Sequence, residues 1–182
     1  MTEMVGAMGL LPASCRAELL LAGPLESPFH QENLASLPGW DRVKLLGWQT
    51  REGIADMLVK CRVGLCVLHP TPNHVNAYPV KLFEYMAAGL PVIASSFPLW
   101  KKLVEGNHCG LTVDPLDPEA ISGAIQYLLE HPEAAQQMGE SGRRAVEEVF
   151  SWSKEGEKLV RFYNSLLDGR SNRLSGQLRE HR

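Results

Sequence analysis

Short apolar runs alternate along the chain with stretches whose apolar residues recur at helical spacing. The apolar runs lie at residues 17–23, 42–48, 63–70, 91–95 and 110–115. Runs of this length bounded by Gly, Pro or Asn predict strands. The run 63–70 is continuously apolar, which is typical of a parallel strand buried on both faces.

Helices are predicted between these strands. Thr50 can cap a helix over 51–61, because Ile54, Met57, Leu58 and Cys61 then fall on one face. Asp117 followed by Pro118 predicts a helix start. The remaining predicted helices cover residues 80–88, 97–107, 118–130, 132–149 and 153–167. Residues 25–41 are expected to form a loop with one helical turn, and one further helix can precede residue 17. The alternation predicts an α/β domain with a mostly parallel sheet and helices on both faces.

Composition limits the domain organisation and the class of partner. The 182 residues are 45% hydrophobic and 21% charged, which is ordinary for a globular protein. We expect one domain over residues 1–168 and a flexible tail over 169–182. The net charge of −3 makes nucleic acid an unsuitable partner. The four cysteines include no C-x-x-C pair and are expected to be free thiols in a reducing compartment.

Two charged residues interrupt the apolar stretch A-Y-P-V-K-L-F-E-Y-M-A-A-G-L-P-V-I-A-S at residues 77–95. Lys81 lies in the first predicted turn of a helix, where a cation opposes the helix dipole unless an anion is bound. Glu84 follows one turn later on the same face, which Tyr85 and Ala88 share. The pair can bind a phosphate and two ribose hydroxyls. It can also be an exposed ion pair of the protein surface, and the spacing alone favours this second interpretation.

Three segments together resemble the C-terminal domain of GT-B glycosyltransferases, the nucleotide-sugar-binding half of the GT-B fold. They are P-V-K-L-F-E-Y-M-A-A-G-L-P-V-I-A-S, C-G-L-T-V-D-P-L-D-P-E-A-I and M-G-E-S-G-R-R-A-V with the F-S-W-S-K that follows. The combination of E-x-M-A-x-G-x-P-V-I-A and G-L-x-V-x-P is similar to the large retaining family 4. The resemblance covers about residues 17 to 167. Within the family, it is greatest to members that assemble bacterial surface polysaccharides.

The resemblance implies a Rossmann-like fold and a donor site. Glu84 matches the family glutamate that holds the ribose, and Lys81 is expected near the diphosphate. Asn76 stands where the family has a second glutamate that touches the donor sugar. Ala77 and Tyr78 continue this donor loop, and Gly47 begins the segment whose backbone meets the base. The donor is expected to be a nucleoside-diphosphate sugar of UDP or GDP type.

The resemblance further implies retaining transfer of a sugar to a glycan or lipid-linked acceptor. The acceptor would bind through an N-terminal domain that residues 1–16 do not supply, and an earlier strand with a glycine-rich turn is also expected. The chain is therefore interpreted as an incomplete enzyme with no assigned catalytic residue. A GT-B nucleotide-sugar epimerase and a non-catalytic nucleotide-sugar-binding module stay open as alternatives.

Absent motifs narrow the chemistry. No D-x-D occurs, which disfavours metal-dependent transfer, so no metal or cofactor is expected. No dinucleotide, P-loop or hydrolase-elbow motif occurs either. No run of 18 apolar residues is present, and the N-terminus lacks the features of a signal peptide. The expected location is the cytoplasm, with peripheral association of the full enzyme at the inner face of the membrane left open.

The histidines of the predicted ligand loop and the tryptophans are expected to have structural roles. His69, Thr71 and His74 lie in the predicted ligand loop, where a single histidine is more often structural than catalytic. The four tryptophans, Trp40, Trp48, Trp100 and Trp152, are expected to contribute to packing.

Overall fold

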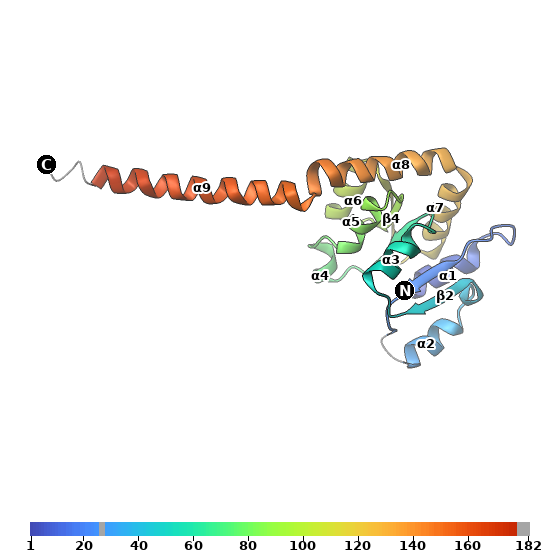
Figure 1. Cartoon of the computed structure of the whole chain (residues 1–182). Helices are drawn as coiled ribbons and strands as arrows, with labels where there is room; N and C mark the ends of the chain where they lie inside the picture. The colour runs from blue at the N-terminus through green and yellow to red at the C-terminus, as the bar shows by residue number, and fades with distance from the viewer. Residues whose placement is uncertain (26–27, 178–182) are drawn as a thin grey trace. The chain divides into compact units, whose positions relative to one another are not determined.

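The computed structural model describes residues 1–25 and 28–177 (Figure 1). The chain divides into two compact units, Met1–Ala145 and Val146–Arg182. The first unit contains five described strands: β1 (Leu19–Ala22), β2 (Val43–Gly47), β3 (Gly64–Cys66), β4 (Val92–Ser95) and β5 (Gly110–Val113). Its helices are α1 (Thr2–Leu10), α2 (Pro28–Ala35), the 3-10 helix η1 (Trp40–Arg42), α3 (Arg51–Leu58), α4 (Pro72–Val75), α5 (Val80–Ala87), α6 (Pro98–Gly106), α7 (Pro118–Glu130) and α8 (Pro132–Ala145).

All described strand pairs are parallel, as the alternating pattern predicts. The strands form two sheets rather than the single sheet expected: β1 pairs with β2, and β3, β4 and β5 form the second sheet with β4 in the centre. All four residues of β4 are buried. The α/β class with a parallel sheet is therefore confirmed, and the division into two sheets is the difference.

One hydrophobic core joins the two sheets inside the first unit. Leu19 of β1, Ile93 of β4 and Val113 of β5 belong to the same buried cluster as Met8 of α1 and Ile125 of α7. Helices α1 and α7 pack against each other beneath this cluster. Helix α5 covers β3 and β4 from the other side through the fully buried Leu82 and Met86. Helices therefore lie on both faces, as predicted.

Local signals placed several helix starts correctly. The Thr50 hydroxyl accepts a hydrogen bond from the Gly53 N–H at 3.1 Å. The Asp117 carboxylate accepts from the N–H groups of Glu119 and Ala120 at 2.9 and 3.2 Å. Each cap satisfies donors that have no partner inside the helix.

Helix α2, Pro28–Ala35, lies within the loop expected over residues 25–41 and is longer than the one turn predicted there. Its sequence is polar and carries no strong helical pattern, but Leu34 is only 1% exposed. Packing of this one leucine therefore favours a helix that the local pattern underestimates. Residues 26–27 of the same expected loop lie outside the described part.

The C-terminal helices differ from their predicted boundaries. Helix α8 ends at Ala145, and a π-helical turn, Val146–Phe150, separates it from α9 (Trp152–Gln177) in the second unit. The sequence predicts one helix to 149 and the next to 167. The expected tail over 169–182 is thus helical up to Gln177, and residues 178–182 lie outside the described residues. Within the described residues, no helix has the length and apolar character needed to cross a bilayer.

Helical glycines provide a stability test of the packing between α8 and the end of α5. A Cβ at Gly139 would overlap the carbonyl oxygen of Gly89, whereas a Cβ at Gly123 of α7 meets nothing within 4 Å. We predict that Gly139→Ala lowers the free energy of unfolding by about 1–3 kcal/mol, the usual cost of overpacking. Gly123→Ala should raise it by about 0.5–1 kcal/mol through helix propensity.

Urea denaturation of both variants measures these two changes. Equal effects of the two substitutions would contradict the close contact between α8 and the Gly89 turn.

Candidate functional site

The predicted site residues lie along the connection from α4 to α5. Asn76 follows the four-residue helix α4, and its side-chain amide donates to the Pro72 carbonyl at 3.2 Å. Ala77 and Tyr78 come next, and Asn76, Ala77 and Tyr78 are all exposed. These three residues together with Lys81 and Glu84 are called the carboxyl-edge site below, because they follow the carboxyl end of β3.

A buried tryptophan fixes the middle of this connection. The Trp100 indole N–H donates to the Ala77 carbonyl at 2.7 Å, and the Trp100 side chain has no exposed surface. Phe97 packs on Trp100 with ring centroids 4.9 Å apart. The sequence predicted packing for Trp100 but not this hydrogen bond, which holds the exposed loop against α6.

The loop that leads to the site is fixed at its start by Ser95. The Ser95 hydroxyl, fully buried at the end of β4, donates to the Leu68 carbonyl and accepts from the Leu68 N–H, both at 2.9 Å. Sequence reasoning missed this residue. Its signal is a hydroxyl at the last position of an otherwise apolar strand, at the edge where parallel sheets bind ligands.

The two loop histidines have structural partners, as the sequence favours. His69 Nε2 lies 2.9 Å from a carboxylate oxygen of Glu3 in α1. His74 Nδ1 lies 3.0 Å from the His69 carbonyl and donates to it. Partial burial acts to raise the pKa of Glu3, but the hydrogen bond to His69 and other local interactions hold that pKa below its usual value.

Helix α5 begins without a side-chain cap. Pro79 occupies the N-cap position and supplies no side-chain cap. Its carbonyl accepts from the Leu82 N–H at 3.1 Å, which leaves the N–H groups of Val80 and Lys81 for water or a ligand. Lys81 is half-buried and Glu84 is exposed. Within residues 1–25 and 28–177, neither Lys81 nor Glu84 forms an ion pair, with each other or with another side chain. Lys81 and Glu84 therefore do not form the surface ion pair that the spacing alone favours.

Tyr85 does not share the exposed face that the helical wheel predicts. Its ring packs against β3, where it occupies the space that a Cβ at Gly64 would take. Burial, with smaller effects from Cys66, Cys61 and Glu84, raises the pKa of Tyr85 to about 12. Ala87 is exposed, so it does not pack on the sheet. The face of α5 that packs on the sheet therefore includes Tyr85, which lies against β3.

Gly47 belongs to the other sheet. It ends β2 with a φ of +62°, and its carbonyl accepts from the Gly23 N–H at 2.7 Å. This bond joins the carboxyl ends of β1 and β2, and Gly47 has no hydrogen bond to the α4–α5 connection. Trp48, next in the chain, is 83% exposed, and Trp152 is 88% exposed. The prediction that these two tryptophans pack in the protein is wrong.

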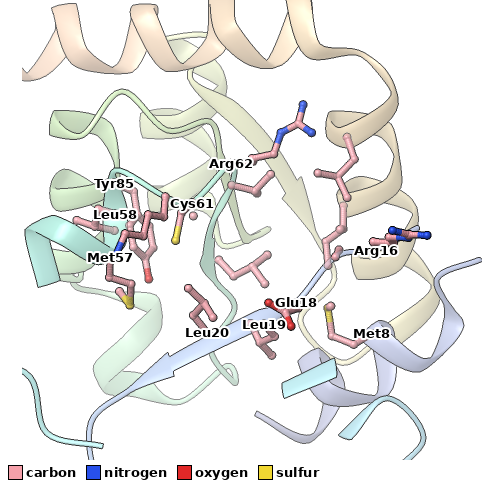
Figure 2. A pocket seen from close by; sticks show the side chains of 17 residues that line it. Met8, Arg16, Glu18, Leu19, Leu20, Met57, Leu58, Cys61, Arg62 and Tyr85 are labelled. Atoms are coloured by element: carbon pink, nitrogen blue, oxygen red, sulfur yellow. The ribbon is translucent and has the colours of Figure 1, made fainter. Parts of the chain in front are cut away.

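A cavity of about 300 Å³ lies away from the carboxyl-edge site (Figure 2). Its charged lining residues include Arg16, Glu18 and Arg62, which precede β1 and β3. They therefore lie at the amino ends of these strands. The carboxyl-edge site itself is a largely exposed surface, in which Lys81 and Glu84 lack ion-pair partners among the described residues.

Cysteine side chains take no part in the site. All four are free thiols, and Cys66 and Cys109 are buried. Burial raises the pKa of Cys66 to about 12, although the positive charge of Lys81 acts in the opposite direction. Burial also raises the pKa of Cys109, to about 11.

Comparison with known proteins gives one consistent family. Residues 3–145 match the family described as glycosyl transferases group 1. The chain is 27% identical to the MMP alpha-(1->4)-mannosyltransferase of Mycolicibacterium hassiacum over 91% of its own length and 40% of that protein. It is 26% identical to the O-antigen chain mannosyltransferase C of Escherichia coli, over 89% and 44% of the two chains. The chain thus spans less than half the length of these relatives.

Solved structures agree with this comparison. Sucrose-phosphate synthase from Thermosynechococcus elongatus superposes with a TM-score of 0.77 at 27% identity, covering 92% of this chain and 42% of that one. Anabaena HepE, solved in complex with UDP, gives a TM-score of 0.76 at 18% identity, over 90% and 44% of the two chains. The second likeness concerns the fold alone, and the Rossmann-like half of a GT-B fold is therefore confirmed.

The hydrogen bond from Trp100 to Ala77 can be tested by substitution. We predict that Trp100→Phe lowers the free energy of unfolding by about 1–3 kcal/mol, because a partly buried hydrogen bond and packing volume are lost. It should also accelerate amide exchange over residues 76–79. Trp48→Phe is the matched control and should change neither quantity, since Trp48 is exposed. Similar losses in both variants would contradict the assigned role of Trp100.

Two buried thiols and the buried Tyr85 phenol predict a fall in the free energy of unfolding at alkaline pH. The pKa values of Cys66, Cys109 and Tyr85 are raised in the folded chain to about 12, 11 and 12. The unfolded chain therefore loses these protons first, and folding is favoured fully only below the unfolded values, near 8.5 for Cys and 10 for Tyr. Each group can remove up to about 1.4 kcal/mol per pH unit as pH rises above them.

Urea denaturation between pH 8 and 10.5 measures this slope. Cys66→Ala should make the slope smaller because one titrating group is gone. An unchanged slope in Cys66→Ala would show that the thiol is not protected from ionisation in the folded chain.

Proposed function

The chain belongs to the glycosyl transferases group 1 family, and we propose that its carboxyl-edge site binds the nucleoside diphosphate of a sugar donor. The proposal rests mainly on the position of Lys81 and Glu84 and on their lack of ion-pair partners. Both lie on the start of an uncapped helix, and neither is neutralised by an ion-pair partner in the described part of the chain. A charged pair left free on a fixed backbone is available for a ligand of matching charge.

Each residue has a proposed role that follows from its chemistry. The Lys81 ammonium and the first-turn N–H groups of α5 would stabilise the diphosphate. The Glu84 carboxylate would accept hydrogen bonds from both ribose hydroxyls. Asn76 would bond a sugar hydroxyl without adding charge, beside the exposed backbone of Ala77 and Tyr78. Gly47, in the neighbouring sheet, would present backbone to the base.

The catalytic part of the proposal concerns a longer protein. There, the donor sugar would pass to a glycan or lipid-linked acceptor with retention at the anomeric carbon, and Lys81 would stabilise the leaving diphosphate without a metal. Support comes from the relatives, which include mannosyltransferases. A lipid-linked acceptor would place that protein in the cytoplasm at the inner face of the membrane.

Thermal denaturation with UDP and with GDP tests donor binding by the 182-residue chain. A ligand at a hundred times its Kd stabilises the folded state by about 2.7 kcal/mol. For a chain of this size, that raises the Tm by roughly 5–10 °C. We predict such a rise with one of the two nucleotides, and a loss of at least about tenfold in affinity, or 1.4 kcal/mol, in Lys81→Met and in Glu84→Gln.

The chain offers a control pair with the same spacing. Lys154 and Glu157 lie three residues apart on α9 and form an exposed ion pair at 3.8 Å. Lys154→Met and Glu157→Gln should leave the nucleotide-induced rise unchanged. A rise that survives Lys81→Met and Glu84→Gln would move the nucleotide to another site, and no rise with either nucleotide would remove donor binding from this chain.

A further inference from the structure

Trp48 is a large aromatic side chain left open at the carboxyl end of β2. It follows Gly47, the last residue of that strand, and is 83% exposed. Within the described part of the chain, the Trp48 indole has no hydrogen bond and no ring contact. Trp100, by contrast, is fully buried and donates its indole N–H to the Ala77 carbonyl. The Trp48 side chain therefore adds little to the packing of the fold.

The backbone that carries Trp48 is held on both sides. Before it, the Gly47 carbonyl accepts from the Gly23 N–H at 2.7 Å, which joins the ends of β1 and β2. After it, the Gln49 side-chain amide donates to the Leu46 carbonyl at 2.5 Å. A ligand that contacts the indole does not have to order the main chain around it, so little binding free energy is lost.

Two glycines leave free space beside the indole. Gly23 and Gly47 have φ values of +113° and +62°, in the region that favours glycine. A Cβ added at either position would meet nothing within 4 Å. The surface next to Trp48 is therefore bare backbone at the end of two parallel strands, where a flat ring can approach closely.

Trp48 lies at the same level of the molecule as the start of α5. Helix α3 begins three residues after Trp48, and Met57 near its end lines the same cavity as Tyr85 of α5 (Figure 2). At about 1.5 Å per residue, each helix begins roughly 8–9 Å before that shared wall. The starts of α3 and α5 therefore lie on the same side of the strands, at their carboxyl ends. One bound nucleotide can extend from Lys81 toward Trp48.

We propose that the Trp48 indole stacks on the nucleobase of the donor. This contact rests on the proposed function and adds a side chain to it: the Gly47 backbone would meet the edge of the base, and Trp48 would cover its face. Every nucleobase has an aromatic face, and truncation of a stacking aromatic side chain lowers affinity by about 5- to 150-fold. Trp48 would therefore contribute affinity at the end of the donor opposite to the diphosphate.

Titration of the 182-residue chain with UDP and with GDP tests this contact. A stacked base quenches indole fluorescence, so nucleotide binding should quench the unmodified chain and not Trp48→Phe. Calorimetry should give a Kd at least about fivefold higher in Trp48→Ala than in the unmodified chain. Trp48→Phe keeps an aromatic face and should bind more tightly than Trp48→Ala. Because Trp48 is exposed, both variants should keep the Tm that the chain has without nucleotide.

Trp152 provides the matched control. It is 88% exposed and lies on α9 in the second unit. Trp152→Phe should preserve the quenching, and Trp152→Ala should preserve the Kd. Equal losses of affinity in Trp48→Ala and Trp152→Ala would overturn the proposal, since the effect would not depend on the position next to Gly47.

The titrations separate failure of the stacking contact from failure of donor binding. If neither nucleotide binds the unmodified chain, donor binding is removed from this chain and stacking on Trp48 with it. If a nucleotide binds and Lys81→Met weakens it while Trp48→Ala leaves the Kd unchanged, the donor site stands and the stacking contact is overturned. Quenching that survives Trp48→Phe would also overturn it, because the base would then lie against another tryptophan.

Discussion

The buried hydroxyl of Ser95 determines where the connection from β3 to α5 begins. It donates to and accepts from the backbone of Leu68, so the association of β3 with β4 continues past the last residue of the strand. A hydroxyl buried at this depth is stable only when both its donor and its acceptor capacity are used. The following connection is held again where Trp100 bonds Ala77 and where Leu82 is buried beneath α5. Between these points, Asn76 and Tyr78 remain exposed on a backbone that does not move freely.

The same arrangement explains why an exposed surface can act as a binding site. Binding affinity is reduced when groups must be ordered by the ligand. Here, the loop that carries Asn76 and the helix that carries Lys81 and Glu84 are ordered by partners on the protein side, from β4 and α6. Lys81 and Glu84 have no ion-pair partner in the part of the chain that the structure describes, and the Lys81 charge lies near the uncapped start of α5. A bound anion would relieve the unfavourable interaction between that charge and the helix dipole.

Local signals in the sequence were sufficient for the strands, the caps at Thr50 and Asp117, and the helix that bears Lys81 and Glu84. These features depend on neighbouring residues, so a period or a single cap identifies them. Features that depend on distant residues were missed or wrong. Tyr85 is turned toward β3 because Gly64 leaves space for its ring, and Trp48 is exposed because no other element covers it. No local pattern contains that information.

The division of the strands into two sheets also depends on residues that are distant in the sequence. Strand runs predict strands but not their partners, because pairing depends on which edges meet across the fold. The His69 carbonyl accepts a hydrogen bond from the His74 ring, and the His69 ring contacts the Glu3 carboxylate. It therefore connects the start of α1 with the loop that precedes the carboxyl-edge site. Helix α1 leads into β1 and this loop follows β3, so contacts between segments that belong to the two sheets also hold the site loop in place.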